Sequence, residues 1–283
     1  MPAVLEIIKK TTDFLAGKGV DSARLNAEHL VGHALGLKRM ALYLQFERSL
    51  TADELEKIRR LVRRRAQREP LQHILGETEF CGLKIKCDRR ALIPRPETEQ
   101  LVELVTLLLD HSPDTVLDLG TGTGAIALAL ATHWPTTRVT AVDASADALA
   151  LAAENIAALN LTDRVALLHS DWCAALAVDT RFDLIVANPP YLSAAETASA
   201  APEVREFDPP AALTAAEDGL AELRRILSET PARLNSGGLL ALETGIEQHA
   251  TLLRLATEAG FARAESRQDL TKRDRFLLAW QPG

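Results

Sequence analysis

Several features that mark other classes of protein are absent from this sequence or scarce in it. Its 283 residues include only three cysteines, Cys81, Cys87 and Cys173, which form neither a CxxC pair nor a disulfide framework. No stretch approaches about 18 consecutive apolar residues, so we expect no membrane-spanning helix. The first residues meet a glutamate and lysines before any apolar segment develops, and we expect no secretory signal. These absences predict a reduced, cytoplasmic protein without membrane contact.

Metal-binding signatures are also missing. His29 and His33 lie four residues apart in a segment expected to be helical, but neither a catalytic glutamate nor a third ligand accompanies them. Cys81 and Cys87 offer no better ligand set. We therefore expect no bound metal and interpret these side chains as ordinary surface or core residues. The sequence contains no internal repeat.

The charge is unevenly distributed along the chain. Residues 1–90 carry 18 Lys and Arg against 12 Asp and Glu, whereas the remainder carries 14 against 27. This split favours two domains and suggests that residues 1–90 bind a negatively charged partner. The acidic remainder argues against an enzyme that grips duplex DNA through its catalytic face.

The front of the chain is predicted to be helical, because apolar residues recur there at three- and four-residue spacing. Thr51 and Glu54 have the pattern of a capping box that starts the last of these helices. That helix carries a run of basic residues over 57–68. Such a run is usually the solvated face of a helix, but a weak contact with RNA, a ribosome or an acidic protein surface is the alternative.

Further along, the pattern changes from helical to alternating. Two prolines in Leu92–Glu99 predict a stiff extended turn, followed by helical spacing from Leu101. From residue 115 onward, short apolar strands alternate with helices, which predicts a mostly parallel sheet with helices on both faces. Near the end we expect a helix over Gly219–Asn235, with Pro231 as a point of interruption, and a strand over Leu239–Glu243.

A glycine-rich turn follows the first strand of this alternating region and opens directly into a helix. Glycines let the backbone turn sharply and lie against a ligand. The G-x-G-x-G spacing differs from the dinucleotide-binding motif, and no lysine follows to meet a phosphate as in a P-loop. An adenosyl-amino acid, which has no pyrophosphate to neutralise, fits better. The candidate cofactor residues of this turn, which comes after Asp118, are Gly120, Thr121, Gly122, Thr123 and Gly124.

Two further candidates follow the next strands. Asp143 sits at the tip of the second strand, where a carboxylate can accept both ribose hydroxyls, although a helix-capping role is the alternative. Asp171 and Trp172 follow the third strand, where the carboxylate could meet an adenine amino group and the indole could cover the ring; Trp172 could equally be part of the core. All these residues fall at the carboxyl ends of consecutive parallel strands, where open α/β sheets bind ligands.

The fourth strand ends in Asn188, Pro189, Pro190 and Tyr191, the sharpest chemical signal in the chain. Prolines fix the backbone and donate no N–H, so the Asn188 side chain and the backbone carbonyls face a cavity as acceptors. An amide or exocyclic amino group has two hydrogens, and the Asn188 side-chain oxygen and the Pro189 carbonyl can accept one each. The alternative is a purely structural role, as a proline turn after a buried strand.

Such acceptors suit methyl transfer to a planar nitrogen. The lone pair of that nitrogen is conjugated, which makes it a weak nucleophile. Its position relative to the methyl group therefore matters most for the rate, and alignment of the reactants lowers the activation free energy by on the order of 7–11 kcal/mol. Acceptors that strengthen as the nitrogen becomes positive favour the transition state. Tyr191 would stack on the flat substrate group. The tetrapeptide contains no strong base, and this chemistry requires none before transfer.

The combination of Asp118–Gly124, Asn188–Tyr191 and Ile93–Glu99 resembles the release-factor glutamine N5-methyltransferase family of the PrmC/HemK type. The resemblance covers nearly the whole chain. The N-P-P-Y tetrapeptide is shared with DNA adenine and rRNA guanine methyltransferases, whereas the Ile93–Glu99 segment is far more specific to this family. The chain departs from the family pattern at Thr244 and lacks a glycine that is common near 271–274; neither position touches the proposed chemistry.

This resemblance implies both a fold and an activity. The fold would be a class I S-adenosylmethionine-dependent methyltransferase, with a Rossmann-like, seven-stranded, mostly parallel sheet and a small N-terminal helical domain. Residues Gly120–Gly124, Asp143, Trp172 and Asn188 would bind S-adenosyl-L-methionine, which leaves as S-adenosyl-L-homocysteine. Asn188–Tyr191 would hold the glutamine of the Gly-Gly-Gln motif in class I peptide-chain release factors, the proteins of translation termination.

We expect three segments and a monomeric protein. Residues 1–72 would form a helical substrate-recognition domain that grips the release factor, 73–93 a hairpin linker, and 94–283 the methyltransferase domain. Alternative functions are an RNA methyltransferase acting on adenine N6 or guanine N2, a ribosomal-protein glutamine methyltransferase, and a non-catalytic cofactor-binding adaptor. The intact Asn188–Tyr191 tetrapeptide argues against the adaptor. The segment Asp208–Pro210 is expected to be a loop, with a flap over the site as a hypothesis.

Overall fold

The computed structural model describes all of residues 1–283, and the chain divides into two units. The N-terminal unit comprises Met1–Glu77 together with the later segment Ala201–Phe207, and the C-terminal unit comprises Thr78–Ala200 and Asp208–Gly283. The division assigns the hairpin, from Thr78 on, to the C-terminal unit. None of the helices is long and apolar enough to cross a membrane.

The N-terminal unit is helical, as expected. Val4, Ile8 and Leu15 lie on one face of its first helix and pack with Ile58 and Val62 of a later helix in a single apolar core. The helices owe this packing to apolar residues at three- and four-residue spacing, which line one stripe of each helix. The elements of this unit are α1 (Val4–Ala16), α2 (Ala23–Leu35), α3 (Arg39–Tyr43), α4 (Ala52–Ala66), α5 (Leu71–Leu75) and α10 (Pro202–Arg205).

The predicted capping box at the start of α4 is confirmed. The Thr51 hydroxyl accepts a hydrogen bond from the backbone N–H of Glu54, while the Glu54 carboxylate accepts from the backbone N–H of Thr51 at 2.9 Å. Both partners satisfy backbone donors that the first turn of a helix leaves without intrahelical acceptors. The Glu54 carboxylate also accepts two hydrogen bonds from Arg48, which ties the helix start to the preceding loop.

The basic run on α4 has two parts with different surroundings. Lys57 and Arg63 are exposed, as a solvated face requires. Arg65 and Arg68 instead hold the carboxylate of Glu203 on α10, with N–O distances of 2.8 and 2.7 Å. The Arg65 side chain is only 7% exposed. Part of the run therefore stabilises the N-terminal unit itself, and the sequence alone could not separate the two parts.

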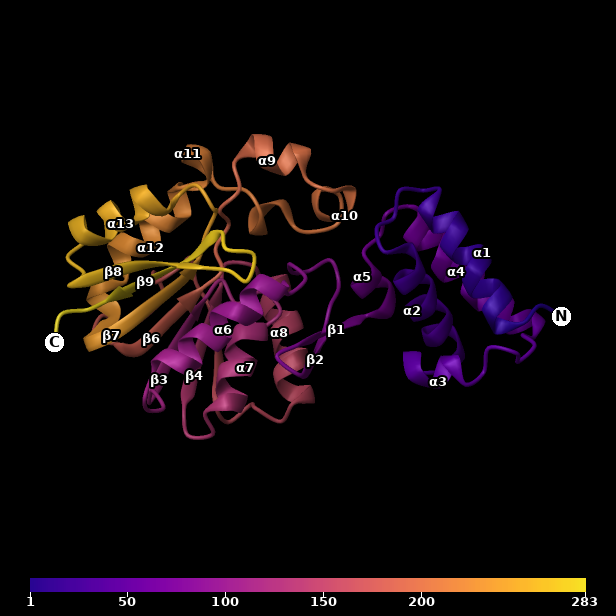
Figure 1. Cartoon of the computed structure of the whole chain (residues 1–283). Coiled ribbons are helices and arrows are strands. Elements are labelled where there is room, and N and C mark those ends of the chain that lie inside the picture. The colour runs from indigo at the N-terminus through magenta and orange to yellow at the C-terminus, as the bar shows by residue number, and fades with distance from the viewer. The chain divides into compact units, whose positions relative to one another are not determined.

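The C-terminal unit is built on a seven-stranded sheet in the order β5-β4-β3-β6-β7-β9-β8 (Figure 1). Strands β3 to β7 run parallel, and β9 is antiparallel to both β7 and β8. The predicted mostly parallel sheet is confirmed. The elements are β1 (Glu77–Phe80), β2 (Leu83–Lys86), α6 (Pro96–Leu108), β3 (Thr115–Leu119), α7 (Ala125–His133), β4 (Arg138–Asp143), α8 (Ala146–Ala158), β5 (Val165–His169), β6 (Phe182–Ala187), α9 (Ala194–Ser199), η1 (Pro210–Ala212), α11 (Ala216–Gly219), α12 (Ala221–Glu229), η2 (Pro231–Arg233), β7 (Leu234–Glu243), α13 (His249–Glu258), β8 (Arg263–Gln268) and β9 (Asp274–Trp280).

Helices cover both faces of the sheet. Val116 of β3 points into the core beneath α6, α7 and α8, whereas its neighbour Leu117 points into the core beneath α12 and α13. This alternation follows from the period of two along a strand, so the parallel strands place apolar side chains on both faces of the sheet. Figure 1 shows the two helical layers on opposite sides of the strands. Both faces of the sheet are thus covered by helices, and the polar residues of the predicted site follow the strands at its carboxyl edge.

Three elements differ from the sequence prediction. The helix expected from Leu101 already begins at Pro96, because proline at the first helical position needs no N–H partner and its fixed φ suits the helix. The helix expected over Gly219–Asn235 ends at Glu229, and β7 starts at Leu234 rather than Leu239. Residues 234–238 lack apolar alternation and include two glycines, so nothing in their pattern indicated a strand.

Candidate active site

The register between β3 and β6 brings the two motifs together. Leu119 of β3 pairs with Ala187 of β6, and the two strands are parallel neighbours. The residues that follow, Gly120 and Asn188, therefore leave the sheet side by side at its carboxyl edge. Strands that neighbour each other here are separated in the sequence by two strands and two helices, so the order of the strands creates this juxtaposition.

A buried carboxylate shapes the glycine turn. Asp118 is fully buried, and its Oδ2 accepts from the Thr121 hydroxyl at 2.6 Å and from the backbone N–H of Ala127 at 3.1 Å. Burial raises the pKa of Asp118 to about 7. These bonds link the end of β3 to the first turn of α7 and hold the loop between them in one shape.

Asp143, at the end of β4, carries the carboxylate that was predicted to bind a ribose. Its Oδ2 accepts from the backbone N–H of Gly122, and its Oδ1 accepts from the backbone N–H of Ser145, both at 2.8 Å. Each oxygen of a carboxylate has a second lone pair, so both can still accept a hydroxyl. Asp143 lines a cavity of this unit. The side chain thus fixes the glycine turn and presents acceptors to the cavity at the same time.

Trp172 also lines the cavity, in a constrained position. Its φ of 47° is in the left-handed region, and its indole N–H donates to Glu222 at 2.6 Å. The ring packs against Gly120, where an added Cβ would lie 3.3 Å from the ring. Glycine at 120, which itself has φ 71°, is therefore required both by the turn and by the indole. The neighbouring Asp171 carboxylate forms an ion pair with Arg225 through both oxygens, so its contact with an adenine amino group stays a prediction.

These residues surround a cavity of about 420 Å³, which suits a ligand the size of S-adenosylmethionine. Its lining fits that cofactor: a carboxylate with spare lone pairs for a diol, an indole for a flat base, and a glycine turn that approaches closely without side chains. The predicted cofactor residues that line the cavity are Gly120, Thr121, Gly122, Thr123, Asp143, Trp172 and Asn188. Gly124, which is also predicted, forms the N-cap of α7 instead, with a φ of 84° in the left-handed region that favours glycine.

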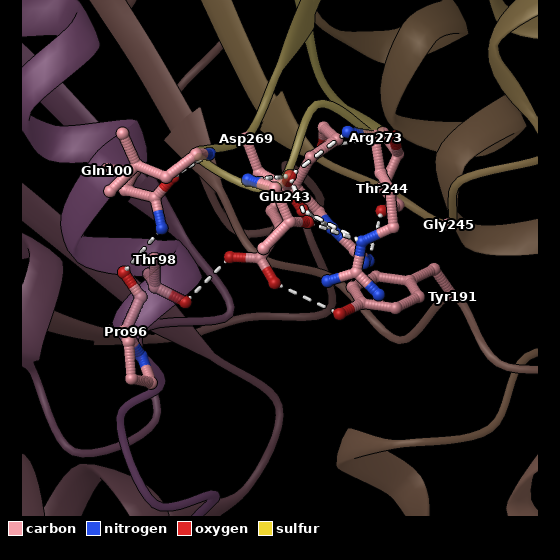
Figure 2. Close-up of polar contacts among 12 residues, drawn as sticks. Pro96, Thr98, Gln100, Tyr191, Glu243, Thr244, Gly245, Asp269 and Arg273 are labelled. Atoms are coloured by element: carbon pink, nitrogen blue, oxygen red, sulfur yellow. Dashed lines mark hydrogen bonds and ion pairs between the residues drawn. The ribbon is translucent and has the colours of Figure 1, made fainter.

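Asn188 lines the same cavity, and its side chain is held by hydrogen bonds on the side away from the cavity. Its side-chain NH2 donates to the Thr98 hydroxyl at 3.0 Å, and the Thr98 hydroxyl donates to Oε2 of Glu243 at 2.6 Å. Asn188 and Thr98 both line the cavity, whereas Glu243 lies behind them and is 1% exposed. Figure 2 shows Glu243 between Thr98 on one side and Tyr191 on the other.

The remaining members of the tetrapeptide have different surroundings. Pro190 lines the cavity, but Pro189 and Tyr191 do not. The Tyr191 hydroxyl donates to Oε1 of Glu243 at 3.0 Å, and its ring lies 5.9 Å from the Arg275 guanidinium. Burial, together with the nearby Glu243 charge, raises the pKa of Tyr191 well above its usual value. Stacking of Tyr191 on the substrate therefore stays a prediction.

Sequence reasoning missed Thr98 and Glu243. Thr98 belongs to the Ile93–Glu99 segment and Glu243 to the end of β7, so both lie in segments that the sequence had already singled out. They are 145 residues apart, and no spacing rule relates them. The one available signal was a carboxylate at the end of an apolar strand, the same signal that identified Asp143.

The segment Asp208–Pro210, set aside as a loop, contributes to the cavity wall. Pro209 and Thr214 are among the lining residues, and η1 lies between them. Asp208 is buried and paired with Arg95, which also lines the cavity. A flap over the site stays a prediction.

With this sheet order, the C-terminal unit has the Rossmann-like fold of class I S-adenosylmethionine-dependent methyltransferases. A methyltransferase from Pyrococcus furiosus has the same fold, with a TM-score of 0.55 at 19% identity over 71% of this chain and 90% of that one. The Thermus thermophilus 16S rRNA N2 G1207 methyltransferase, solved with S-adenosylmethionine and guanosine, gives a TM-score of 0.53 at 22% identity over 72% of this chain and 49% of its own.

Sequence relatives narrow the class further. The family model described as the PrmC N-terminal domain matches residues 6–76, and the one described as the methyltransferase small domain matches residues 99–205. The release factor glutamine methyltransferase of Geobacter sulfurreducens is 44% identical over 97% of this chain and 95% of its own length. That of Rhodopirellula baltica is 40% identical over 97% and 95%. The chain belongs to the release factor glutamine methyltransferase family, which confirms the resemblance and its cofactor, S-adenosylmethionine.

Proposed function

We propose that this chain transfers a methyl group from S-adenosylmethionine to the side-chain amide nitrogen of the glutamine in the Gly-Gly-Gln motif of class I release factors. The observation that carries the proposal is the orientation of Asn188, whose NH2 is tied to Thr98, so that its oxygen is the atom left for a ligand. An acceptor oxygen at this position suits an amide NH2. The relatives that carry the family name favour this function over the RNA-amine alternative.

The protein's part in the reaction is to hold the nitrogen still. The Asn188 oxygen would accept one hydrogen of the glutamine NH2, and Pro190 would limit its movement from the cavity wall. The Pro189 carbonyl, which lies outside the cavity lining, would have to turn toward the substrate to accept the second hydrogen. Two acceptors define the plane of the amide, so the conjugated lone pair lies perpendicular to that plane. Such alignment accounts for a large part of the rate of a reaction whose nucleophile is weak. Both hydrogen bonds strengthen as the nitrogen gains positive charge.

When bound, S-adenosylmethionine would supply an electrophilic methyl carbon to the nitrogen, the electron pair of the carbon–sulfur bond would stay on sulfur, and one N–H proton would pass to solvent. Asp143 would hold the ribose hydroxyls and Trp172 would cover the adenine. The glycine turn from Gly120 to Gly124 would bring the backbone close to the remainder of the molecule. Each of these roles follows from the residue's place in the cavity lining or in the turn.

We also propose that the N-terminal unit recognises the release factor beyond the glutamine loop. The unit has its own apolar core and exposes a basic face on α4 that includes Lys57 and Arg63. A glutamine side chain alone offers few contacts, so selection of one glutamine in one protein requires a second surface.

The test is methylation of a purified class I release factor by the full chain with labelled S-adenosylmethionine. We expect tandem mass spectrometry to place the added mass of one CH2 unit on the Gly-Gly-Gln glutamine. A release factor with that glutamine changed to alanine is the matched substrate control and should remain unlabelled. Label on another residue, or on RNA copurified with the protein and not on the release factor, would overturn the proposed function.

A further inference from the structure

Glu243 is a buried carboxylate behind the cavity, and the proposed methyl transfer assigns it no role. Glu243 is the last residue of β7 and is 1% exposed. Its two oxygens accept from different directions: Oε2 from the Thr98 hydroxyl at 2.6 Å and Oε1 from the Tyr191 hydroxyl at 3.0 Å (Figure 2). A charge that is buried to this degree costs free energy unless its hydrogen bonds compensate for it, so its presence calls for a role.

The polarity of these hydrogen bonds is fixed by elementary counting. A threonine hydroxyl has one hydrogen to donate. An ionised carboxylate only accepts, so the Thr98 hydrogen is committed to Glu243. Thr98 can then only accept from Asn188, and the Asn188 atom that faces it must be the NH2 nitrogen. The Asn188 oxygen is thereby the atom left for the substrate.

We propose that Glu243 and Thr98 are positioning residues that set the orientation of the Asn188 amide, so that its oxygen rather than its nitrogen meets the substrate NH2. This inference rests on the proposed function and extends it from the residue that touches substrate to the pair behind it. Asparagine by itself is nearly symmetric in shape, and a flipped amide would present two hydrogens to a group that also has two. A substrate amide cannot bind in that arrangement.

The ionised form of Glu243 is the form that orients Asn188. A protonated Glu243 could donate to Thr98, whose hydrogen would then be free to turn to Asn188 and favour the flipped amide. The charged groups around Glu243 are Glu97 of α6 and Arg275 of β9, with the Tyr191 hydroxyl beside it. Burial raises the pKa of Glu243 above the usual carboxyl range, and Thr98, Tyr191 and Arg275 act against that rise.

The first test compares two substitutions at Thr98. Thr98→Val keeps the shape but removes the hydroxyl, and we expect kcat to fall roughly tenfold to a hundredfold, less than for direct loss of an oriented contact. Thr98→Ser keeps the hydroxyl and should retain most of the wild-type kcat. Cofactor affinity should stay within a few-fold in both. The matched control is Thr106→Val, on the same helix, whose hydroxyl bonds only to the Glu103 carbonyl and should have no effect on kcat.

A double-mutant cycle separates positioning from a general structural role. If Thr98 acts through Asn188, then Thr98→Val should cause almost no further loss of kcat in an Asn188→Ala background. A loss that multiplies with that of Asn188→Ala would overturn the inference, because it would mean that Thr98 acts independently. Equal kcat for Thr98→Val and wild type would overturn it as well.

The pH profile of kcat tests the role of the Glu243 charge. With both substrates saturating, we expect the wild-type kcat to fall in acid as Glu243 becomes protonated. Glu243→Gln cannot titrate and should lose this acid limb, whatever its plateau value. An acid limb that persists unchanged in Glu243→Gln would contradict the requirement for an ionised carboxylate.

Failure of the inference can be told apart from failure of the proposed function. A wild-type chain that leaves the Gly-Gly-Gln glutamine unmodified, while it binds S-adenosylmethionine, overturns the proposed function. An active wild type with an equally active Thr98→Val variant leaves that function standing and overturns only the positioning role.

Discussion

Replacement of Asp143 by asparagine is expected to weaken cofactor binding out of proportion to its small change in shape. The Asp143 carboxylate accepts from two backbone N–H groups, those of Gly122 and Ser145, each at 2.8 Å. Asparagine has one acceptor oxygen and one NH2 donor. Whichever way the amide turns, its NH2 faces a backbone N–H that it cannot bond, and the cavity loses an acceptor for a ribose hydroxyl.

The magnitude follows from these counts. A polar group left without its partner costs about 1–3 kcal/mol. Because every 1.4 kcal/mol corresponds to a factor of about ten in affinity, the dissociation constant should rise roughly fivefold to a hundredfold. The larger value applies if the Gly122 side of the turn shifts and the glycine backbone no longer approaches the cofactor.

Isothermal titration of the full chain with S-adenosylhomocysteine measures the effect. Asp147→Asn is the matched control, because it makes the same change of charge four residues later on an exposed side chain in the first turn of α8. That variant should bind as the wild type does. If Asp143→Asn also kept the wild-type dissociation constant, Asp143 would be only a turn residue, and the ribose contact would be refuted.

Three further predictions use other parts of the chain. Asn188→Ala should lower kcat by roughly a hundredfold or more, with cofactor affinity within a few-fold; an equal loss of both in steady-state kinetics and titration would make Asn188 mainly a cofactor ligand. Gly219→Ala should lower the melting temperature, because the added Cβ would lie 2.0 Å from the Tyr191 carbonyl oxygen at a φ of +86°; an unchanged melting temperature in calorimetry would contradict this. Burial raises the pKa of Glu203, but hydrogen bonds from Arg68 and Arg65 outweigh this effect and lower the pKa from 4.5 to about 2. Since the folded-state pKa is the lower one, this stabilisation is complete above the unfolded-state value and disappears as pH falls from 4.5 toward about 2. The stability difference between wild type and Glu203→Gln in urea unfolding should therefore shrink over that range, and a constant difference would refute the ion pair's role.

Local patterns were enough to predict much of this molecule. Alternating strands and helices were predicted from residue 115 onward, and the structure begins β3 at Thr115 and places β6 over Phe182–Ala187, because both segments are mostly apolar and lie between turn residues. The glycine turn and Asn188 were recognised because each follows such a strand directly. Parallel strands end at a common edge, so the sequence already implied that their following residues share one region of space.

Features that depend on long-range packing were not predictable. Whether Arg65 faces solvent or an internal carboxylate depends on Glu203, which lies 138 residues further along the chain. The hydrogen bond between Thr98 and Glu243 joins residues 145 positions apart and depends on how α6 packs against β7. Pro96 shows a different limit: proline is compatible both with an extended turn and with the first position of a helix, and only the packing of the following residues decided between them.

The arrangement of hydrogen bonds argues that this site works by positioning rather than by a general base. Each carboxylate that lines the cavity already has a partner in the protein: Asp143 accepts from two backbone N–H groups, Asp171 is paired with Arg225, and Glu222 accepts from Trp172. A neutral amide nitrogen does not need to lose a proton before it attacks, and it becomes a strong acid once the methyl group is attached. Its proton can then pass to water without a dedicated acceptor. The side chains are therefore free to serve as fixed hydrogen-bond acceptors, the role for which Asn188 and the pair behind it are arranged.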